Sequence, residues 1–588
     1  MLYPVAAAVA VVVALVSLVL FTPSLPGYIV RSALQWLGYL NQKKSEARRA
    51  LIRARVRVEE EDYRSRRARQ TAGLKVEEED WETVDKDGGD NGQSSSASSS
   101  NGRNCSDWAG IVGFFHPFCN AGGGGERVLW AAIAAVQKRW PKAICAVYTG
   151  DHDVDKVTML KNIEVGYLYS LRRFNIQLHP PTVVFLYLSM RRYVLSSTWP
   201  HFTLLGQSIG SLILAHDAFT LLVPDIFIDT MGYAFASALS HYLFPKVPTG
   251  AYVHYPTIST DMLESLDDAS GSKGLNSGAG KGWKGAIKKH YWRMFARLYG
   301  WVGSTIDVVM CNSTWTSEHI QRLWLPSRRG RGKQYQTASV VFPPVAVSEL
   351  ESIKIDLRSE QQVRQPAILY IAQFRPEKNH SLILHAFARF LKQYNATAES
   401  RSAADPKASV DGDGRAGSPQ LILIGSVRHQ TSDETHIYNL RLLAHELRIR
   451  DNTTFLCDAN WPTVIENLRK ASIGVNAMWN EHFGIGVVEY QAAGLISVVH
   501  NSGGPKRDIV VDLDDEGATG FHATTEVEFA AAFEAALALP ESEKLAMRLR
   551  ARKSAQRFSG EQFEKKWLCE MEKLVDLQVK HNERTGNI

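Results

Sequence analysis

The sequence predicts an α/β protein with two doubly wound, parallel-sheet domains of the Rossmann type that face each other across a cleft. Short apolar segments alternate with helical segments along most of its 588 residues, a pattern typical of parallel sheets covered by helices. The segments form two sets, joined near Phe342–Val345. Glycine-rich turns follow strand candidates in both sets, where doubly wound domains bind their ligands.

The strand candidates define a first domain, 107–341, and a second domain, 342–558. Those of the first set are Ala109–Phe115, Ala143–Thr149, Thr182–Leu188, Ile226–Thr230, Gly250–Val253 and Val308–Cys311. The second set begins at Val340 and continues with Ile368–Ala372, Leu421–Ile424, Thr454–Leu456, Ile473–Ala477 and Ser497–His500. A helix, Glu561–Leu577, follows the last strand, and we expect the segment 559–588 to pack back on the first domain.

The N-terminus carries a candidate membrane anchor. Residues 5–21 are continuously apolar and just long enough to span a bilayer, so we assign residues 1–30 to a transmembrane helix. A cleaved signal peptide is the alternative, but no basic segment precedes the run and no A-x-A site follows it. Basic residues follow from Arg31 to Arg57. The positive-inside rule therefore predicts a single-pass protein with its globular part in the cytosol.

Residues 31–106 combine a basic helix with a linker. The helical segment Asn41–Arg57 suits either anionic lipid headgroups or plain solvation. Residues 58–106 turn acidic and then rich in Gly and Ser, the composition of a disordered linker. Two more segments of this kind, Asp267–Lys281 and Glu399–Ser418, are expected to be surface insertions.

The apolar stretch 203–224 permits two interpretations. It contains His216 and Asp217, and ionisable side chains are costly at the centre of a bilayer. A buried helix and strand of the first domain are therefore favoured over partial insertion into one leaflet.

Charge and cysteine usage argue against nucleic-acid and metal-binding functions. The net charge of +6 is mild and uneven, and the six cysteines are widely separated without a CxxC pair. A reducing compartment fits this usage best. Asp151 and Asp153 form a D-x-D string, but such a string after a strand is more typical of a turn and helix cap. We predict no nucleic-acid partner and no metal.

Two carboxylates flank a glycine turn in the second domain. Glu481 and Glu489 lie on either side of Gly484, Ile485 and Gly486, between an apolar strand and a helical segment. Backbone N–H groups at such a helix N-terminus can hold a phosphate. An acceptor on each side suits the sugar and ribose hydroxyls of a nucleotide-sugar. Because two solvated glutamates at this spacing are common by chance, the hypothesis of an activated-sugar site depends on other segments.

Three other segments agree with it. Asn501–Pro505 is a second glycine loop, one strand further along the chain. Arg375 and Lys378 supply cations directly after a strand, at the usual ligand edge of an open α/β sheet. Gly122–Gly125 lies between a strand and an apolar helix of the first domain.

These segments carry a resemblance to a known family. From the first glycine loop to the final helix, the chain resembles the retaining GT-B glycosyltransferases of family 4. Within that family it is similar to the α-1,2-mannosyltransferases that extend a dolichyl-diphosphate-linked oligosaccharide. The motifs are HPFCNAGGGGERVLW (His116–Trp130), AYVHYPTISTDML (Ala251–Leu263), CNSTWT (Cys311–Thr316), FRPEKNH (Phe374–His380) and EHFGIGVVEYQAAG (Glu481–Gly494).

The resemblance implies a GT-B fold and a defined reaction. Mannose would pass from GDP-mannose, held by the second domain, to a Man3GlcNAc2 dolichyl-diphosphate acceptor on the first, giving Man5GlcNAc2 with retention at the anomeric carbon. The setting would be the cytosolic face of the endoplasmic reticulum membrane, in protein N-glycosylation, beside other mannosyltransferases of the pathway. The enzyme would need no metal or other cofactor.

The resemblance also assigns roles to residues. The expected catalytic residues are His254, Glu481, Arg375 and Lys378. The expected substrate-binding residues are Gly123, Gly124, Gly125, Gly484, Ile485, Gly486 and Glu489. Arg375 and Lys378 would meet charge on the departing diphosphate. Glu489 would accept from the ribose and Glu481 from the mannose, whereas His254 would face the sugar or the acceptor.

Other functions remain as alternatives. The nearest is another family 4 glycosyltransferase with a different nucleotide-sugar or lipid-linked acceptor. A non-catalytic scaffold of the same fold would be expected to lose Lys378, Glu481 or the glycine loops, and all are present. A dinucleotide oxidoreductase is excluded because Gly122–Gly125 lacks the G-x-G-x-x-G spacing.

Overall fold

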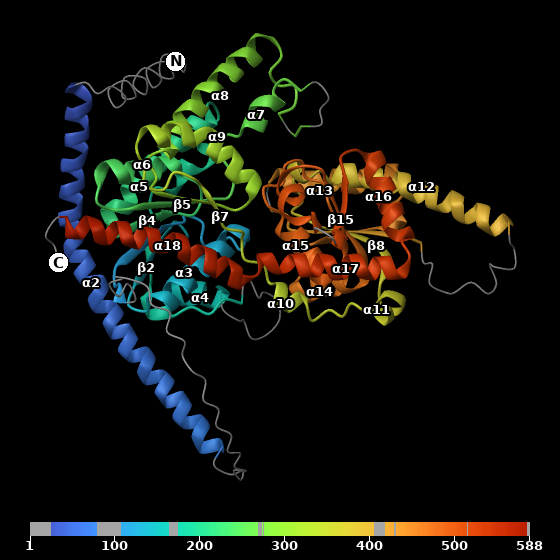
Figure 1. Ribbon diagram of the computed structural model, residues 1–588, viewed down its shortest axis with the longest axis horizontal. Coiled ribbons are helices and arrows are strands. Elements are labelled where there is room, and N and C mark those ends of the chain that lie inside the picture. The colour runs from blue at the N-terminus through green and yellow to red at the C-terminus, as the bar shows by residue number, and fades with distance from the viewer. Residues whose placement is uncertain are drawn as a thin grey trace.

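The computed structural model contains two parallel-sheet domains side by side, with helices packed around each sheet (Figure 1). This confirms the predicted pair of Rossmann-like domains. The structure describes residues 25–78, 107–163, 175–268, 273–274, 276–404, 418–428, 431–513 and 516–584.

The first-domain sheet has the strand order β3-β2-β1-β4-β5-β6-β7, and its strands are parallel. The strands are β1 (Ile111–Phe115), β2 (Ile144–Thr149), β3 (Val183–Tyr187), β4 (Ile226–Asp229), β5 (Thr249–Val253), β6 (Val308–Cys311) and β7 (Ser339–Val340). One assignment was wrong: Val340 pairs with Cys311 of β6 and ends the first sheet rather than starting the second. Its two-residue strand precedes the crossing between domains, so local pattern did not show which sheet it joins.

The second-domain sheet repeats this arrangement with the order β10-β9-β8-β11-β12-β15. Its strands are β8 (Gln365–Ile371), β9 (Gln420–Gly425), β10 (Thr453–Cys457), β11 (Ala471–Asn476), β12 (Ile496–His500) and β15 (Gly520–Ala523). A small antiparallel pair, β13 (Asp512–Leu513) and β14 (Gly517–Ala518), lies outside it. In both sheets the order reverses beside the first strand, at β1/β4 and β8/β11, where doubly wound sheets open a ligand crevice.

Helices cover the sheets and complete the cores. Those of the first domain are α3 (Gly124–Arg139), α4 (Lys156–Ile163), α5 (Thr203–Leu221), α6 (Ala234–Leu243), α7 (Thr260–Ser265), α8 (Gly282–Gly303) and α9 (Thr314–Gly330). Those of the second are α10 (Val347–Leu350), α11 (Leu357–Gln362), α12 (His380–Ala404), α13 (Ser432–Glu446), α14 (Trp461–Lys470), α15 (Ile485–Ala493), α16 (Glu526–Ala538) and α17 (Glu541–Ala555).

The last helix, α18 (Gly560–Glu583), leaves the second domain and runs across the first (Figure 1). Its Phe563, Trp567 and Leu574 are buried in the same core as β1 and α3. The chain therefore crosses between the domains twice, because it also enters the second domain after β7.

A long helix, α2 (Leu25–Glu78), lies along the outer edge of the first domain (Figure 1). It is helical over 58–78, where a linker was expected. Pairs four residues apart, such as Arg55 with Glu59, support the helix, and Glu59 also pairs with Lys156 of the first domain. The expected anchor, residues 5–21, lies outside the described residues.

Residues 203–221 form the helix α5 of the first domain, as favoured above. Leu214, Ala218 and Phe219 are fully buried in a core with β4 and α6. Across the described parts of the chain, we find no helix with the length and apolar character that a membrane span requires.

Candidate active site

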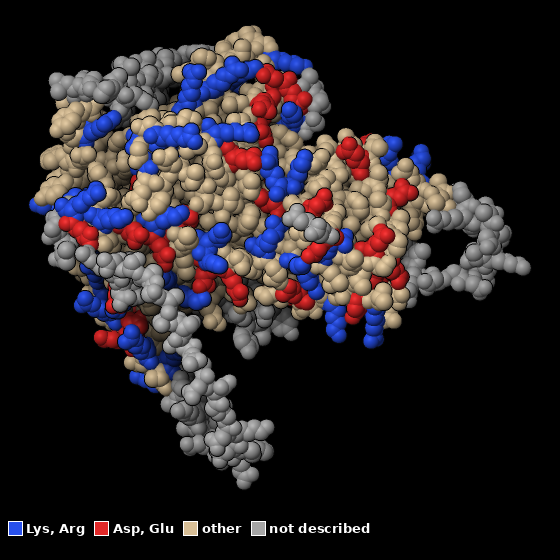
Figure 2. All heavy atoms as spheres, in the orientation of Figure 1, with Lys and Arg blue, Asp and Glu red and all other residues tan. Residues whose placement is uncertain are grey.

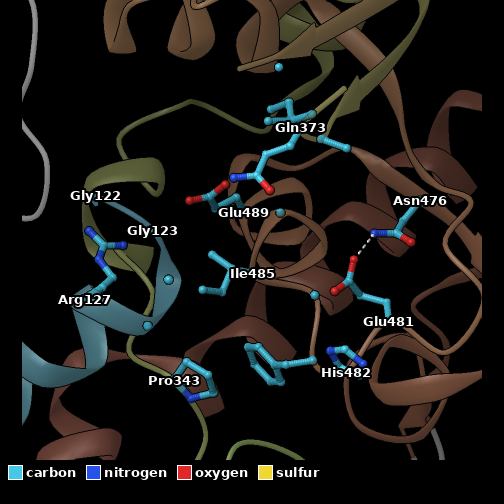
Figure 3. A pocket seen from close by; sticks show the side chains of 18 of the residues that line it. Gly122, Gly123, Arg127, Pro343, Gln373, Asn476, Glu481, His482, Ile485 and Glu489 are labelled. Carbon is cyan, nitrogen blue, oxygen red and sulfur yellow. Dashed lines mark hydrogen bonds between the residues drawn. The ribbon is translucent and has the colours of Figure 1, made fainter. Parts of the chain in front are cut away.

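A cavity of about 560 Å³ lies between the domains, at the carboxyl ends of both sheets (Figure 3). Residues at or after the ends of β1, β8 and β11 line it, so each switch point contributes at least one strand, as the doubly wound fold leads one to expect. Nearly all of the residues predicted for the site line it: Gly123, Gly124, Gly125, His254, Lys378, Glu481, Gly484, Ile485, Gly486 and Glu489. Arg375 does not.

The glycine loops of the two domains meet in this cavity. A Cβ added at Gly124 would come within 2.6 Å of the Ile485 Cδ1 atom on α15. Gly484, directly before α15, has a φ of +106°, which a residue with a side chain rarely adopts. The backbone conformation at Gly484 therefore favours glycine, whereas at Gly124 the contact shows how closely the loop approaches Ile485. Together they place two helix N-termini, those of α3 and α15, at one cavity.

A buried hydrogen-bond network fixes the first glycine loop. The Glu126 carboxylate accepts from the Gly123 N–H at 2.5 Å, and its other oxygen lies 3.4 Å from Nε2 of His116. Nδ1 of His116 lies 2.8 Å from the Thr230 hydroxyl. Burial alone would raise the pKa of Glu126, but His116 and the backbone N–H hold it below its ordinary value. The loop is thus tied to the ends of β1 and β4.

The second glycine loop supports the turn that carries Glu481. The Gly504 N–H donates to the Glu481 carbonyl at 2.7 Å. A Cβ at Gly503 would lie 2.3 Å from that same carbonyl oxygen. The Asn480 N–H, one residue before, donates to the Ser502 hydroxyl at 2.8 Å. Residues 501–505 therefore pack against the backbone at Glu481 and fix its position.

Glu481 and Lys378 form an ion pair in the cavity. Nζ of Lys378 lies 2.5 Å from Oε2 of Glu481, and both side chains are mostly buried. The Asn476 amide, at the end of β11, donates to the same oxygen at 3.4 Å (Figure 3). Burial raises the pKa of Glu481, but Lys378 outweighs it and keeps the pKa below the ordinary value. The carboxylate is therefore ionised at neutral pH and ready to accept hydroxyl donors.

Two arginines occupy unexpected places. Arg375 faces α13, where its Nε lies 3.9 Å from Asp433, and it is not among the residues that line the cavity. Arg127, in the first turn of α3, lines the cavity instead (Figure 3). Burial lowers its pKa, while the carboxylates of Glu489 and Glu349 act in the opposite direction. The first domain thus contributes a cation that was not predicted, directly after the glycine loop.

Burial shifts the pKa values of Glu489 and His254 in the direction that favours their neutral forms. Burial raises the pKa of Glu489 to about 7, with Arg127 opposing the shift. Burial and His116 lower the pKa of His254 to about 4, so its ring is neutral at physiological pH. Its Nε2 lies 3.1 Å from the Thr230 carbonyl. Because a carbonyl can only accept, Nε2 carries the proton and Nδ1 is left as an acceptor.

Asp151, the first residue of the D-x-D string, supports a loop. Its carboxylate accepts from the Asn120 N–H at 2.9 Å and pairs with Arg191. Within the described residues, no three His, Cys, Asp or Glu side chains are grouped closely enough to hold a metal ion.

Comparisons with known proteins agree with this geometry. Residues 109–324 match the model of the ALG11 mannosyltransferase N-terminus, and residues 353–557 match that of glycosyl transferases group 1. A GDP-Man:Man(3)GlcNAc(2)-PP-Dol alpha-1,2-mannosyltransferase of Neurospora crassa is 55% identical over 96% of this chain and 95% of its own. The chain belongs to this mannosyltransferase family. The mouse member is 42% identical over 79% of this chain and 87% of its own.

Solved structures place the family in the GT-B fold. The N-terminal domain of Candida albicans trehalose-6-phosphate phosphatase aligns with a TM-score of 0.54, at 12% identity, over 81% of this chain and 98% of its own. Sucrose-phosphate synthase from Thermosynechococcus elongatus aligns with a TM-score of 0.52, at 14% identity, over 79% and 99%. At such low identity these likenesses establish the fold alone.

Other residues of the cavity had not been predicted, and they come from several elements. They include Arg127, Glu349, Trp461 and Asn476. The Trp461 Nε1–H donates to Glu349 at 2.9 Å, which fixes both side chains. A sequence signal existed for Asn476, which ends a buried strand, and for Arg127, which follows a glycine loop. None existed for Glu349, because only the fold brings α10 to the site.

Proposed function

We propose that the protein transfers mannose from GDP-mannose to Man3GlcNAc2 diphosphodolichol, in α-1,2 linkage, to give Man5GlcNAc2 diphosphodolichol. The observation that carries the proposal is the Lys378–Glu481 ion pair beside the N-terminus of α15 in the interdomain cavity. A cation and helix N–H groups suit a diphosphate, and an ionised carboxylate suits sugar hydroxyls. Membership of the family supplies the identities of donor and acceptor.

Two GDP-mannose molecules are used in succession, and each transfer forms one glycosidic bond and breaks the bond between the anomeric carbon and the phosphate oxygen of one donor. The acceptor hydroxyl oxygen bonds to the anomeric carbon on the face from which GDP leaves, so the configuration is retained. Its proton passes to the departing phosphate oxygen. Lys378 and the N–H groups at 484–486 meet the charge that grows on the diphosphate, because preorganised dipoles in a partly dry cleft stabilise such charge without reorganising. Glu481 holds the mannose during the transfer, and the neutral His254 provides an acceptor.

Transfer of labelled mannose tests the proposal directly. Purified protein is incubated with GDP-mannose and Man3GlcNAc2 diphosphodolichol, and the released glycan is sized and digested with an α-1,2-specific mannosidase. Growth by two mannoses that the mannosidase removes is expected. Transfer from UDP-glucose or UDP-N-acetylglucosamine in place of GDP-mannose would contradict the donor assignment and favour a different family 4 activity.

The same proposal includes metal-independent catalysis at the cytosolic face of the endoplasmic reticulum. Lys378 and the helix N-termini take the place of a metal, so activity should survive EDTA. Strict dependence on added Mg²⁺ or Mn²⁺ would contradict it. The topology is tested by N-glycan sequons such as Asn312, Asn379 and Asn452. They should stay unmodified in the cell, and an endoglycosidase should leave the protein's mobility unchanged.

A further inference from the structure

One face of α8 exposes large apolar side chains to solvent. Trp283 is 71% exposed, Ile287 57% and Met294 56%. With 3.6 residues per turn, these positions lie on one side of the helix. The opposite side, with Trp292 and Tyr299, is buried against the domain. The apolar stripe therefore points directly away from the protein.

Basic side chains border this stripe. Helix α8 contains Lys284, Lys288, Lys289, Arg293 and Arg297 and no Asp or Glu. Figure 2 shows Lys and Arg along this part of the first domain, with a group of Asp and Glu beside them. Lys289 pairs with Asp267 at 2.5 Å, which leaves the other four cations of α8 to border the stripe. Nζ of Lys284 lies 5.6 Å from the centre of the Trp283 ring. Tryptophan at the centre with lysine and arginine at the sides is the pattern of a helix that lies in a membrane interface.

Phe202 extends the apolar surface from a neighbouring element. It is 53% exposed and adopts a left-handed φ of +53°, which is strained for a residue with a side chain. Its ring packs edge to face on Tyr291 of α8, with centroids 5.2 Å apart. The Tyr291 hydroxyl accepts from the Leu205 N–H at 3.0 Å. The start of α5 and the exposed face of α8 are thus joined in one surface.

This surface is connected to the mouth of the active site. In the loop before α8, a Cβ on Gly274 would lie 2.8 Å from the ring of Trp479, two residues before Glu481. In α7, which precedes that loop, Asp261 accepts from the Asn480 amide at 2.7 Å. A bilayer on this face would thus lie beside the segment that carries Glu481.

We propose that the exposed face of α8, with Phe202, docks on an anionic lipid bilayer. The basic border selects a bilayer over a neutral apolar partner, since cations near anionic headgroups gain electrostatic attraction while their stems and the tryptophan enter the interface. This contact would be separate from the anchor predicted at residues 5–21. It deepens the proposed function, because an acceptor held in the membrane by its lipid would then present its glycan at the cavity mouth.

A fluorescent label in the full-length protein tests the docking without relying on activity. Ile287→Cys, and Leu442→Cys on α13 as a matched exposed control, are made with Cys105 and the exposed Cys457 and Cys569 replaced by Ser. The proteins are reconstituted in phosphatidylserine-containing vesicles with nitroxide-labelled lipid. Quenching at 287 but not at 442, weakened in purely phosphatidylcholine vesicles, is expected. Equal quenching of the two labels by nitroxide lipid would overturn the proposal. It would also be overturned if the label at 287 were quenched to the same extent without nitroxide lipid, because the quenching would then come from contact between protein molecules.

A second experiment separates this inference from the proposed function. The triple variant Trp283→Ser, Ile287→Ser, Met294→Ser should transfer mannose to the dolichyl-linked acceptor in anionic vesicles at least about tenfold more slowly. With the same glycan on a short, water-soluble lipid, it should match the parent enzyme. An equal loss with both acceptors would overturn the docking role. A parent enzyme inactive on both would count against the proposed function and leave the labelling result standing.

Discussion

Glu489 and Arg127 occupy the same cavity from opposite domains, and their electrostatic contact sets how the site responds to pH. The pKa of Glu489 is raised by burial to about 7, above its ordinary value, so part of the carboxyl is protonated at neutral pH. If the ribose hydroxyls require the carboxylate, binding of GDP must release this proton. Affinity is then full above pH 7 and is lost as the pH falls through it.

We therefore expect GDP affinity to weaken below pH 7, by up to about tenfold per pH unit. Calorimetric titration between about pH 6 and about pH 8 measures this. Glu489→Gln should lose this dependence and keep only that of the phosphate. In Arg127→Gln the midpoint should move to higher pH, because Arg127 lowers the pKa of Glu489. A midpoint that does not move would mean that Arg127 does not act on this carboxyl.

The two carboxylates should also differ in what they bind. In the proposed function the glycine turn at 484–486 binds the diphosphate between them, and a diphosphate has a nucleoside at one end and a sugar at the other. Glu489→Ala should weaken GDP binding by about 1.5–3 kcal/mol, the value of a hydrogen bond to a charged group. Glu481→Ala should leave GDP affinity nearly intact but reduce transfer. Equal losses of GDP affinity in the two variants would contradict the assignment of Glu489 to the ribose and of Glu481 to the mannose.

The cations provide a third comparison. Lys378 lies in the cavity, whereas Arg375 faces Asp433 outside it. Lys378→Ala should lower kcat by about 10²–10³, the usual cost of one group that stabilises transition-state charge. Arg375→Ala changes the other cation that was expected to meet charge on the diphosphate, and it should lower kcat much less. Steady-state rates measured for the two variants show whether both cations act on the diphosphate, as the sequence motif predicts, or mainly Lys378, as the structure indicates.

At this scale the sequence located most of the cavity, because glycine loops and charged residues after strands are local patterns. For Arg375 and Arg127, local sequence patterns did not predict which side chain lines the cavity. Both follow a strand and a turn in the sequence, and only the packing of α13 and of α3 determines which guanidinium reaches the cavity. Glu349 could not be found at all, since its helix reaches the site through the fold alone.

Among the elements, α18 stabilises a domain from which it is far removed in the sequence. Trp567 is fully buried in the first-domain core, although the whole second domain separates it from that domain in sequence. Trp567→Ala should destabilise the first domain by about 3–5 kcal/mol, the usual cost of emptying such a site. Lys566→Ala, on the exposed side of α18, should cost little. Urea unfolding monitored by fluorescence of both variants tests this, and equal midpoints would contradict the packing role of α18.

Element prediction succeeded where apolar runs were long enough. The longer strands of both sheets were found because buried parallel strands are continuous apolar runs. The strand β15 was missed because Gly520–Ala523 is short and mixed in character. The helix α2 was cut short at 58, since its acidic and basic residues resemble a solvated linker until their pairing with Lys156 and His179 is seen.

In the whole molecule, contacts between the domains surround the cavity. The rings of Tyr255 and His482 stack with centroids 4.9 Å apart. Asp261 of the first domain accepts from the Asn480 amide at 2.7 Å. The Thr314 N–H donates to Asp508 at 2.9 Å. The ion pair between Arg507 and Glu318, whose atoms lie 2.6 Å apart, also joins the domains. Polar groups at the edge of the cleft should therefore influence how readily it opens.

Removal of the Asp261 carboxylate tests this control of the cleft. Asp261→Ala removes a hydrogen bond to a charged group across the interface, worth about 1.5–3 kcal/mol. The balance between open and closed forms should therefore shift toward the open form by about tenfold or more. Small-angle scattering should show a larger radius of gyration, and KM for donor and acceptor should rise while each domain keeps its unfolding transition. Asp451→Ala, exposed at the edge of the second domain, should change none of these. A normal radius together with normal KM values in Asp261→Ala would show that other contacts hold the domains together.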